Sequence, residues 1–358
     1  MTDSPRTAEF TYAGNADWSD LAARFRAADH VVLVTHRKPD GDAIGSLVGV
    51  ARILESVVDR VDMLIVGPMD PALLEAAGGV GAATLTMVEG GAPEGLDPDL
   101  VCVCDTGAWS QLEPLGPWLR ERRDRVIGID HHASGDDVAV ARIVDTAAAS
   151  TTQMIVHLAD ALDVPLDAAI ATPLYLGLAT DTGWFRFSNA DAACYRVAAQ
   201  LLAAGVEKDR LYQMVEETHR PARLALSGRA LSGLQYAAGG AVAVQSLGPA
   251  DFAAARGGTE DLVGLVNVPM SVSQIRASVF ATESEPGMTK ISFRGKPGAS
   301  GRPDADVNEL ASTFGGGGHR FAAGARIPEP LETAMPKIVA AVDAWATAAG
   351  LVPEAVSG

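Results

Sequence analysis

The sequence has little cysteine and little positive charge. Cys102, Cys104 and Cys194 are the only cysteines in 358 residues, and no CxxC pair occurs, so no disulfide framework is expected. Cys102 and Cys104 alternate in the strand-like run VCVCD and are predicted to be small buried residues. The 28 Lys and Arg residues against 45 Asp and Glu give a net charge of -17. This balance disfavours long duplex nucleic acid as a partner, because such binders usually carry a basic face.

Long apolar runs are also missing. No stretch reaches the roughly 18 apolar residues of a membrane span, so no membrane partner is expected. The N-terminal MTDSPRTAEF has no basic region followed by an apolar core and is not predicted to be a secretory signal. Together with the sparse cysteines, these features favour a reducing cytoplasm. Hydrophobic residues nevertheless make up 48% of the chain, enough to bury the cores of two or three domains.

Strand-like and helix-like runs alternate through the first half of the chain. Short apolar runs predict strands at 30–36, 61–67, 100–105 and 126–130. Residues 43–57 and 150–162 have helical spacing, and 171–183 is predicted to be a helix that runs into a loop. This alternation predicts an α/β architecture with a mostly parallel sheet.

The second half of the chain has a different pattern of apolar and polar residues. Residues 192–231 look helical and polar-faced and are predicted to link two lobes. Short alternating runs at 241–247, 275–281 and 289–295 then predict an antiparallel or mixed sheet, followed by a glycine-rich stretch at 314–325 and a helix in 331–350. We therefore expect an α/β domain at 1–190, a helical linker at 191–232, a smaller α/β domain at 233–345 and a tail at 346–358.

Acidic residues and histidines gather where apolar runs end. The candidates are His36, Asp40 and Asp42 in THRKPDGD, Asp105 after LVCVC, Asp130, His131 and His132 in IDHH, and Asp181 in LATDTG. Ligands bind beyond the carboxyl ends of strands in open α/β sheets, so these side chains are expected to converge. Each has a simpler explanation alone: Asp42 could cap the helix that begins at Ala43, and Asp105 could form a turn. Four such ends pointing the same way favour one shared site.

The number and type of these groups predict metal binding. Carboxylates combined with imidazoles suit Mn, Fe, Co or Zn. Five carboxylates and three imidazoles exceed the ligands that one metal needs, which suggests two metals bridged by a carboxylate. Two metals roughly 3.5–4 Å apart are the usual arrangement for phosphoester hydrolysis, because they acidify a water and neutralise charge on the phosphate.

The order of these motifs resembles that of the DHH phosphoesterase family: H-x-x-P-D-x-D, then a strand-end Asp, then D-H-H, and later D-T-G. The GGGGH sequence at 315–319 resembles the family's DHH-associated domain, so the resemblance covers roughly residues 25–340. It implies two α/β domains joined by a helical linker, with the active site in the cleft between them. The composition, rich in Ala and Gly and with more Arg than Lys, is typical of a GC-rich bacterial source such as an actinobacterium.

The resemblance also implies a role for each candidate residue. His36 and Asp40 would hold one Mn²⁺, Asp42, His131 and Asp181 would hold a second, and Asp105 would bridge the two. Asp130 would orient an imidazole, and His132 would face the scissile phosphate. The nucleophile would be a hydroxide that bridges the metals.

The second domain offers candidate substrate-binding residues. The glycines Gly316, Gly317 and Gly318 could let backbone N–H groups approach a phosphate, and His319 could donate to the same anion. Arg294 fits the family's S-x-R motif, and its guanidinium suits phosphate; here a glycine follows it where many relatives have serine. The alternatives are a flexible linker for the glycines and an exposed strand charge for Arg294.

An aromatic patch, Trp184 to Phe187, lies beside Asp181 in the sequence. It could stack a nucleobase or form core beneath the loop.

Within the family, three substrate classes compete. The net charge and short chain disfavour long single-stranded DNA, and SFRGKPG lacks the Lys and Arg density of the pyrophosphatases. We expect a Mn²⁺-dependent cytoplasmic enzyme that hydrolyses nanoRNA such as pApA, 3′-phosphoadenosine 5′-phosphate and cyclic di-AMP to AMP. The alternatives are a nucleotide sensor without turnover and a pyrophosphatase with the same metal centre. The resemblance also implies a homodimer.

Overall fold

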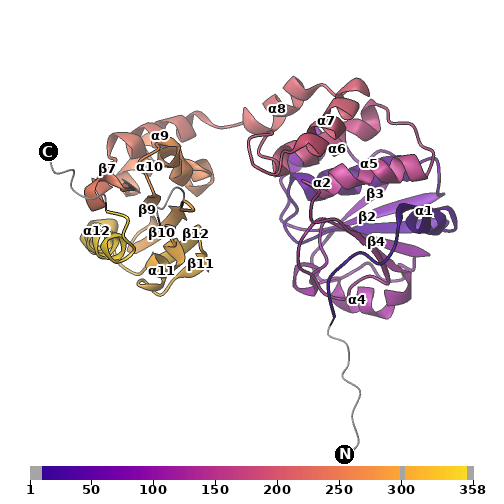
Figure 1. Cartoon of the computed structure of the whole chain (residues 1–358), viewed down its shortest axis with the longest axis horizontal. Helices are drawn as coiled ribbons and strands as arrows, with labels where there is room; N and C mark the ends of the chain where they lie inside the picture. The colour runs from indigo at the N-terminus through magenta and orange to yellow at the C-terminus, as the bar shows by residue number, and fades with distance from the viewer. Residues whose placement is uncertain (1–9, 299–302, 353–358) are drawn as a thin grey trace, which may run out of the picture. The chain divides into compact units, whose positions relative to one another are not determined.

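The computed structural model describes residues 10–298 and 303–352. Contacts divide the chain between Thr218 and His219 into two compact units, each with its own hydrophobic core. Figure 1 shows a parallel-sheet unit followed by a smaller unit with a mixed sheet. The predicted α/β class is confirmed for both parts of the chain.

The first unit is built on a six-stranded parallel sheet. Its strands are β1 (His30–Val34), β2 (Arg60–Val66), β3 (Thr84–Val88), β4 (Leu100–Cys104), β5 (Val126–Asp130) and β6 (Ala141–Val144). Their order is β3-β2-β1-β4-β5-β6, so the chain changes direction across the sheet between β1 and β4. Open α/β sheets bind ligands at this switch point, beyond the carboxyl ends of the strands. His36 follows β1 and Asp105 follows β4, which places both candidates there.

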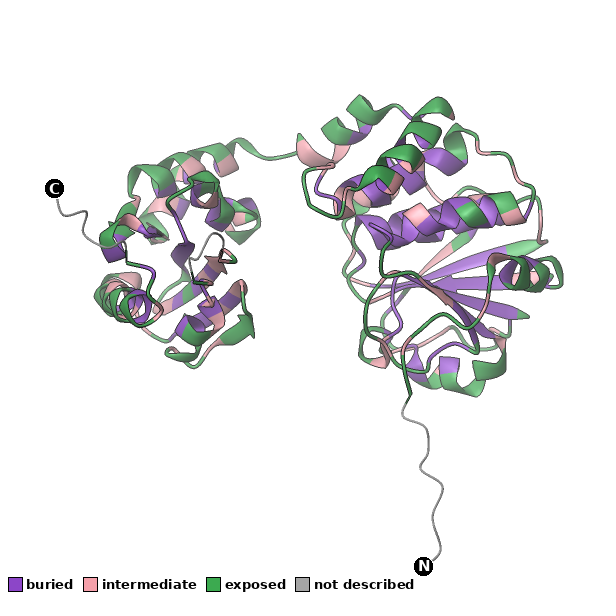
Figure 2. Ribbon diagram, in the orientation of Figure 1, coloured by how far each residue is buried: buried purple, intermediate pink, exposed green. Residues whose placement is uncertain are grey.

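Helices cover both faces of this sheet. They are α1 (Trp18–Arg26), α2 (Gly41–Leu54), α3 (Pro71–Ala76), α4 (Gly116–Glu121), α5 (Thr151–Ala161), α6 (Ala168–Asp181), α7 (Ala192–Ala203) and α8 (Lys208–Glu216). The larger core joins the sheet to α1, α2, α5, α6 and α7, and a smaller core joins the other face to α4. The four central strands, β1, β2, β4 and β5, are therefore buried along almost their whole length, as Figure 2 shows. Cys102 and Cys104 are buried and reduced, as predicted.

Helices α2 and α6 approach each other unusually closely. Three glycines recur every fourth residue of α2, at Gly41, Gly45 and Gly49, and all face α6. A Cβ atom on Gly45 would overlap the carbonyl oxygen of Pro173, and one on Gly49 would overlap the side chain of Leu174. The missing side chains let the two helices pack backbone to backbone. We call these contacts the glycine seam.

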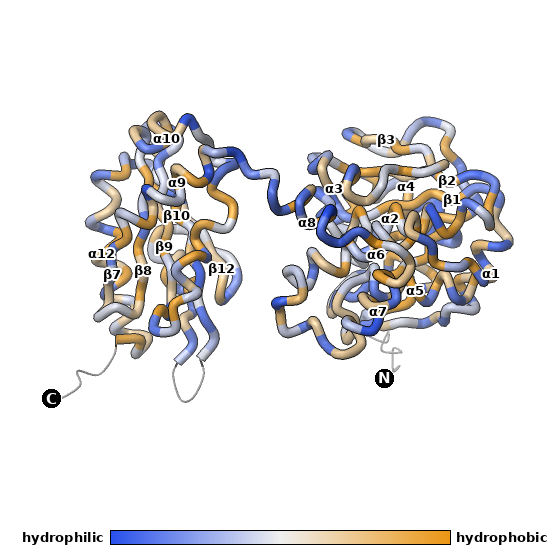
Figure 3. The backbone as a smooth tube through the Cα atoms, turned by 90° about the horizontal axis from the view of Figure 1, so that it is seen from above, coloured by the Kyte–Doolittle hydropathy of each residue, from blue (hydrophilic) through white to orange (hydrophobic). Residues whose placement is uncertain are grey.

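The second unit is a mixed sheet between two layers of helices. Its elements are α9 (Pro221–Ser232), β7 (Gln235–Ala237), β8 (Val242–Leu247), α10 (Pro249–Ala255), β9 (Ala277–Glu285), β10 (Met288–Gly295), α11 (Val307–Ser312), β11 (Gly317–His319), β12 (Ala322–Ile327) and α12 (Leu331–Ala348). The strand order is β11-β12-β10-β9-β8-β7; β8 and β9 are parallel and the other pairs antiparallel. One face packs on α11 and α12 and the other on α9 and α10. Hydrophobic residues, orange in Figure 3, follow these buried elements.

The helical stretch predicted as one linker is shared between the two units. Helix α7 packs on α5 and α6, and α8 contacts α3, whereas α9 packs on β8 and α10. At the other end, α12 continues to Ala348, past the predicted start of the tail, and residues 353–358 lie outside the described part. Within the described residues, every helix is too short or too polar to cross a membrane.

Candidate metal centre

The first motif surrounds the start of α2. Asp40 is the N-cap residue, and its carboxylate accepts hydrogen bonds from the N–H groups of Asp42 and Ala43, both at 3.1 Å. The idea that Asp42 caps this helix is therefore wrong, because Asp40 does so. The Nε2 atom of His36 lies 3.8 Å from Asp40 Oδ1. His36 and Asp40 thus face each other across the turn that joins β1 to α2.

Asp42 is held by a different helix. It is 1% exposed, and its two oxygens accept hydrogen bonds from the N–H groups of Thr151 (2.7 Å) and Thr152 (3.0 Å). The Thr152 hydroxyl donates a third bond at 2.7 Å. These donors belong to the first turn of α5, whose positive dipole end favours a buried carboxylate. Sequence reasoning missed both threonines as supporting residues, although helical spacing did predict a helix over 150–162.

Asp105 occupies the centre of the site. It is 2% exposed and has a φ of +61°, a left-handed conformation that is uncommon for a residue other than glycine. The Thr151 hydroxyl donates to its Oδ1 at 2.9 Å. Burial, together with the neighbouring Asp42 carboxylate, raises the pKa of Asp105 well above its ordinary value. Such strain is characteristic of functional sites, and a carboxylate in this position needs a compensating cation.

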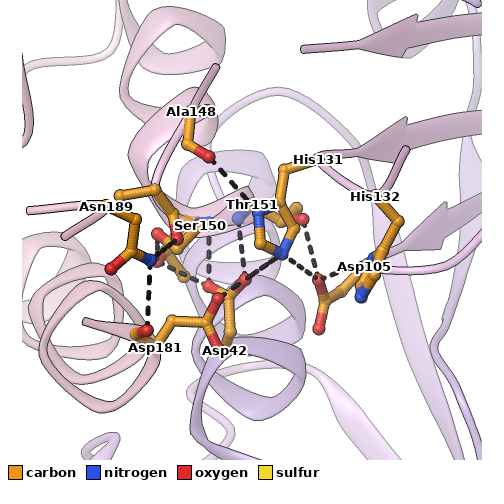
Figure 4. A network of polar contacts seen from close by, with 12 residues as sticks. Asp42, Asp105, His131, His132, Ala148, Ser150, Thr151, Asp181 and Asn189 are labelled. Carbon is orange, nitrogen blue, oxygen red and sulfur yellow. Dashed lines mark hydrogen bonds and ion pairs between the residues drawn. The ribbon is translucent and has the colours of Figure 1, made fainter. Parts of the chain in front are cut away.

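Two imidazoles turn their Nε2 atoms toward Asp105. Figure 4 shows His131, whose Nδ1 lies 3.4 Å from the carbonyl oxygen of Ala148. Its Nε2 lies 3.6 Å from Asp105 Oδ1 and 3.4 Å from Asp181 Oδ2. The Nε2 of His36 lies 3.4 Å from the other oxygen of Asp105. In His36 the Nδ1 lies 3.0 Å from the Arg37 carbonyl oxygen, the arrangement that leaves Nε2 free to ligate a metal.

These side chains form groups with the spacing of metal ligands. The groups are His36, Asp40 and Asp105; Asp42, His131 and Asp181; and Asp105, His131 and His132, and within each group the ligand atoms lie within 4.8 Å of one another. Burial and the charges of Asp42 and Asp40 raise the pKa of Asp181 to about 7. Carboxylates crowded in this way repel one another unless cations lie between them. The oxygen and imidazole donors fit divalent transition metals.

Asp130 forms a hydrogen-bonded pair with His132, a member of the third group. Asp130 is 1% exposed, and its Oδ1 lies 2.7 Å from His132 Nδ1. The imidazole that Asp130 orients is therefore that of His132 and not that of His131. The hydrogen bond to Asp130 raises the pKa of His132 to about 9. His132 is thus a half-exposed cation at neutral pH, suited to contact an anion.

Tyr12 forms a second hydrogen bond to the carboxylate of Asp130. Its hydroxyl donates to Asp130 Oδ2 at 2.5 Å, and its ring lies where Cβ atoms on Gly107 and Gly135 would overlap it. The segment that carries Tyr12 is tied to β6, because the N–H of Asn15 donates to the Arg142 carbonyl oxygen at 2.9 Å. No sequence pattern around Tyr12 points to this role.

The tetraglycine of the second unit forms a strand edge and is not a linker. Cβ atoms on Gly316 and Gly318 would overlap the backbone of β12, so glycine is required by close approach. The N–H of Gly318 donates to Asn308 Oδ1 at 2.8 Å, and that of Gly316 donates to the Ala311 carbonyl oxygen. These two N–H groups are therefore engaged within the protein itself.

The other candidates of the second unit share one face. Arg294 lies opposite Ala322 on β12, and Ala322 lies opposite His319 on β11. Directly opposed residues of antiparallel strands project to the same side, so Arg294 and His319 lie in one row.

The aromatic patch of the first unit divides in two. Trp184 and Phe185 pack against the larger core, and the Trp184 indole donates to Glu216 at 2.8 Å. Phe187 is 57% exposed. The core interpretation therefore holds for Trp184 and Phe185, and Phe187 is left as the candidate for a base contact.

Known proteins share this organisation. The model of the DHH family N-terminal domain matches residues 30–178, and that of the DHHA1 domain matches residues 240–348. A bifunctional oligoribonuclease and PAP phosphatase NrnA from Thermus thermophilus is 33% identical over 328 residues, which cover 89% of this chain and 91% of that protein. The protein of the same name from Bacillus subtilis is 28% identical over 318 residues, covering 86% and 93%.

A solved structure agrees with these matches. An exopolyphosphatase-related protein from Bacteroides fragilis superposes with a TM-score of 0.76 at 26% identity, covering 93% of this chain and 97% of that one. The two domain matches, the extent of the likeness to the Thermus protein and the His/Asp site lead to one conclusion. The chain belongs to the DHH/DHHA1 phosphoesterases and is a hydrolase of that family.

Proposed function

We propose that this phosphoesterase is a Mn²⁺-dependent enzyme that hydrolyses short oligoribonucleotides, such as pApA, and 3′-phosphoadenosine 5′-phosphate to AMP. The names of the Thermus and Bacillus relatives support these two substrate classes. Cyclic di-AMP is included because it contains the same 3′,5′-phosphodiester bond as pApA. Long nucleic acids are excluded from the proposal by the net charge of -17.

The observation that carries the proposal is the position of Asp105. Its Oδ2 lies 3.4 Å from His36 Nε2, and its Oδ1 lies 3.6 Å from His131 Nε2. A single buried carboxylate therefore presents one oxygen to each of two ligand groups, as a bridging ligand must. His36 and Asp40 would complete one metal site, and Asp42, His131 and Asp181 would complete the other. When bound, the two ions would acidify a water and offset the charge that develops on the phosphate.

His132 is proposed to bind the reacting phosphate. Its Nδ1 is held by Asp130, so its Nε2–H is the group free to donate to a phosphoryl oxygen. The raised pKa, about 9, keeps this imidazole cationic at neutral pH. A fixed cation at the position where negative charge develops stabilises the transition state more than the ground state.

The test uses the full chain with Mn²⁺ and pApA, followed by chromatography of the products. We expect release of AMP by the wild type and none by Asp105→Asn at equal protein concentration. Tight binding of pApA without AMP release would instead indicate a sensor. Hydrolysis of inorganic pyrophosphate in place of pApA would indicate a pyrophosphatase, and either result would overturn the proposal.

A further inference from the structure

Half of one sheet face in the second unit is open. On this face α9, α10 and the short helix Leu265–Ser271 pack on β8 and β9, and the short helix also contacts β10. The side chains that β10, β12 and β11 present on this face are nevertheless half-exposed or exposed. The alternate residues, such as Ile291 and Phe293, are buried against α11 and α12. The open face is therefore a surface of the folded unit and is supported by a packed core.

The open face consists of three rows of opposed residues. One row holds Arg294, Ala322 and His319; the next holds Ser292, Gly324 and Gly317; and the third holds Lys290 and Arg326. Basic side chains thus lie in the two outer rows, whereas the middle row consists of one serine and two glycines. A groove of about 400 Å³ lies beside the third row, and its lining includes Lys290, Ser292, Gly316, Gly324 and Arg326.

Lys290 and Arg326 form a like-charge pair that the fold does not neutralise. They are directly opposed on antiparallel strands, an arrangement that destabilises a sheet. The neighbour of Lys290 on β9 is the neutral Thr282. Among the described residues, no carboxylate forms an ion pair with Lys290 or Arg326, although the chain has 45 acidic residues to offer. Two uncompensated cations beside a groove are the arrangement expected of an anion site.

We propose that Lys290 and Arg326 form a second phosphate subsite that binds the backbone of oligoribonucleotides longer than a dinucleotide. The proposal rests on the proposed function and assigns its substrate length. Lys290 lies four positions before Arg294 on β10, a distance of about 13 Å along an extended strand. A stacked nucleic-acid strand rises about 3.4 Å per nucleotide, so the two basic rows are about four steps apart, and a strand of about five nucleotides spans them. A dinucleotide held at Arg294 and His319 falls short of the second row.

The test compares RNA lengths by binding, without turnover. Fluorescently labelled two- and five-nucleotide RNAs are titrated with the full chain in EDTA, which removes the metals needed for cleavage, and anisotropy is read. In K290Q/R326Q we expect the Kd for the five-nucleotide RNA to rise about tenfold, the usual scale for losing a charged hydrogen bond. The Kd for the two-nucleotide RNA should stay within about twofold, because that strand does not reach the pair.

The matched control is R256Q/K337Q, which removes the same charge from the same unit. Arg256 follows α10, and Lys337 is on α12, against the opposite face of the sheet. Equal weakening of the five-nucleotide RNA by both double variants would show long-range electrostatics and overturn the subsite. An unchanged Kd in K290Q/R326Q would also overturn it. If a thermal melt shows that the double variant does not fold, the single variants K290Q and R326Q give the same comparison.

Hydrolysis by the wild type separates this inference from the proposed function. Length-dependent binding that K290Q/R326Q abolishes, without any release of AMP in Mn²⁺, would support the subsite and overturn the proposed activity. Hydrolysis of both RNAs, with the same preference for length in the wild type and in K290Q/R326Q, would support the activity and overturn the subsite.

Discussion

The hydroxyl of Tyr12 and the carboxylate of Asp130 form a 2.5 Å hydrogen bond across 118 residues of sequence. The other oxygen of this carboxylate lies 2.7 Å from His132 Nδ1, so the three side chains form one chain of contacts. Tyr12 precedes the segment matched by the DHH domain model, which begins at residue 30. A residue near the N-terminus therefore supports the imidazole that we expect to contact the phosphate.

Replacing Tyr12 by Phe removes this donor and keeps the ring. We expect kcat to fall by several-fold while KM changes little, because a less constrained His132 stabilises the transition state less well than before. The free energy of unfolding should fall by about 1 kcal/mol, the typical net contribution of one hydrogen bond. Steady-state kinetics and urea denaturation measure the two effects. A raised KM with an unchanged kcat would show that Tyr12 serves substrate binding instead.

The two adjacent histidines should respond differently to alanine. His131→Ala removes an imidazole whose Nε2 faces Asp105 and Asp181, so the stoichiometry of bound Mn²⁺ should fall. His132→Ala should keep the metal content and lose turnover by about a hundredfold, the scale for one electrostatic contact to a transition state. Metal analysis after dialysis, alongside kcat, separates the two. Equal metal loss in both variants would contradict the assignment of His132 to the phosphate.

Asp105→Asn should uncouple stability from activity. Burial and Asp42 raise the pKa of Asp105, which means that its ionised form destabilises the metal-free fold. The amide removes this charge, so metal-free Asp105→Asn should melt at a higher temperature than the metal-free wild type at pH 8. The same variant should lose turnover and most of the increase in Tm caused by Mn²⁺. A lower Tm in EDTA would show that the Thr151 hydrogen bond outweighs the repulsion.

Asp181 predicts how stability depends on pH when metal is absent. Its pKa rises from 3.8 to about 7 on folding, so between these values the folded state holds a proton that the unfolded state has lost. The free energy of unfolding should therefore fall as the pH rises through this window. The pKa of His36 is raised from 6.5 to about 10. The stability that protonated His36 contributes is therefore lost only as the pH rises above 6.5.

The measurement is urea denaturation in EDTA from pH 5 to pH 8. Asp181→Asn should show a shallower decline than the wild type. Mn²⁺ affinity should rise over the same range, because the metal displaces the proton from Asp181. A wild-type stability that rises with pH in EDTA would contradict this account.

The sequence predicted the central strands of the first sheet and the residues that follow them. The runs at 30–36 and 100–105 are rich in valine and flanked by turns, and His36 and Asp105 follow directly. The edge strands β3 and β6 were not predicted, because TLTMV and ARIV are short and only partly buried. Strands β11 and β12 were not predicted, because glycine disfavours a strand locally. The requirement for glycine at these positions comes from close packing, which only the folded structure shows.

Contacts between distant segments could not be predicted. The hydrogen bonds from Thr151 and Thr152 to Asp42 connect positions more than a hundred residues apart, and a single sequence contains no signal for them. The identity of the helix cap was also ambiguous, because Asp40 and Asp42 both precede an apolar helix. Only the path of the backbone decides that Asp40 faces the free N–H groups of α2.

The glycine seam between α2 and α6 has a consequence for how this protein can vary. Asp42 is at the start of α2 and Asp181 at the end of α6, so the distance between two candidate ligands depends on how closely these helices pack. A single methyl group at Gly45 would push the ligands apart without touching either. In a saturation-mutagenesis survey, Gly41, Gly45 and Gly49 should therefore tolerate substitution as poorly as the ligands themselves, and such losses could be misread as direct damage to the chemistry.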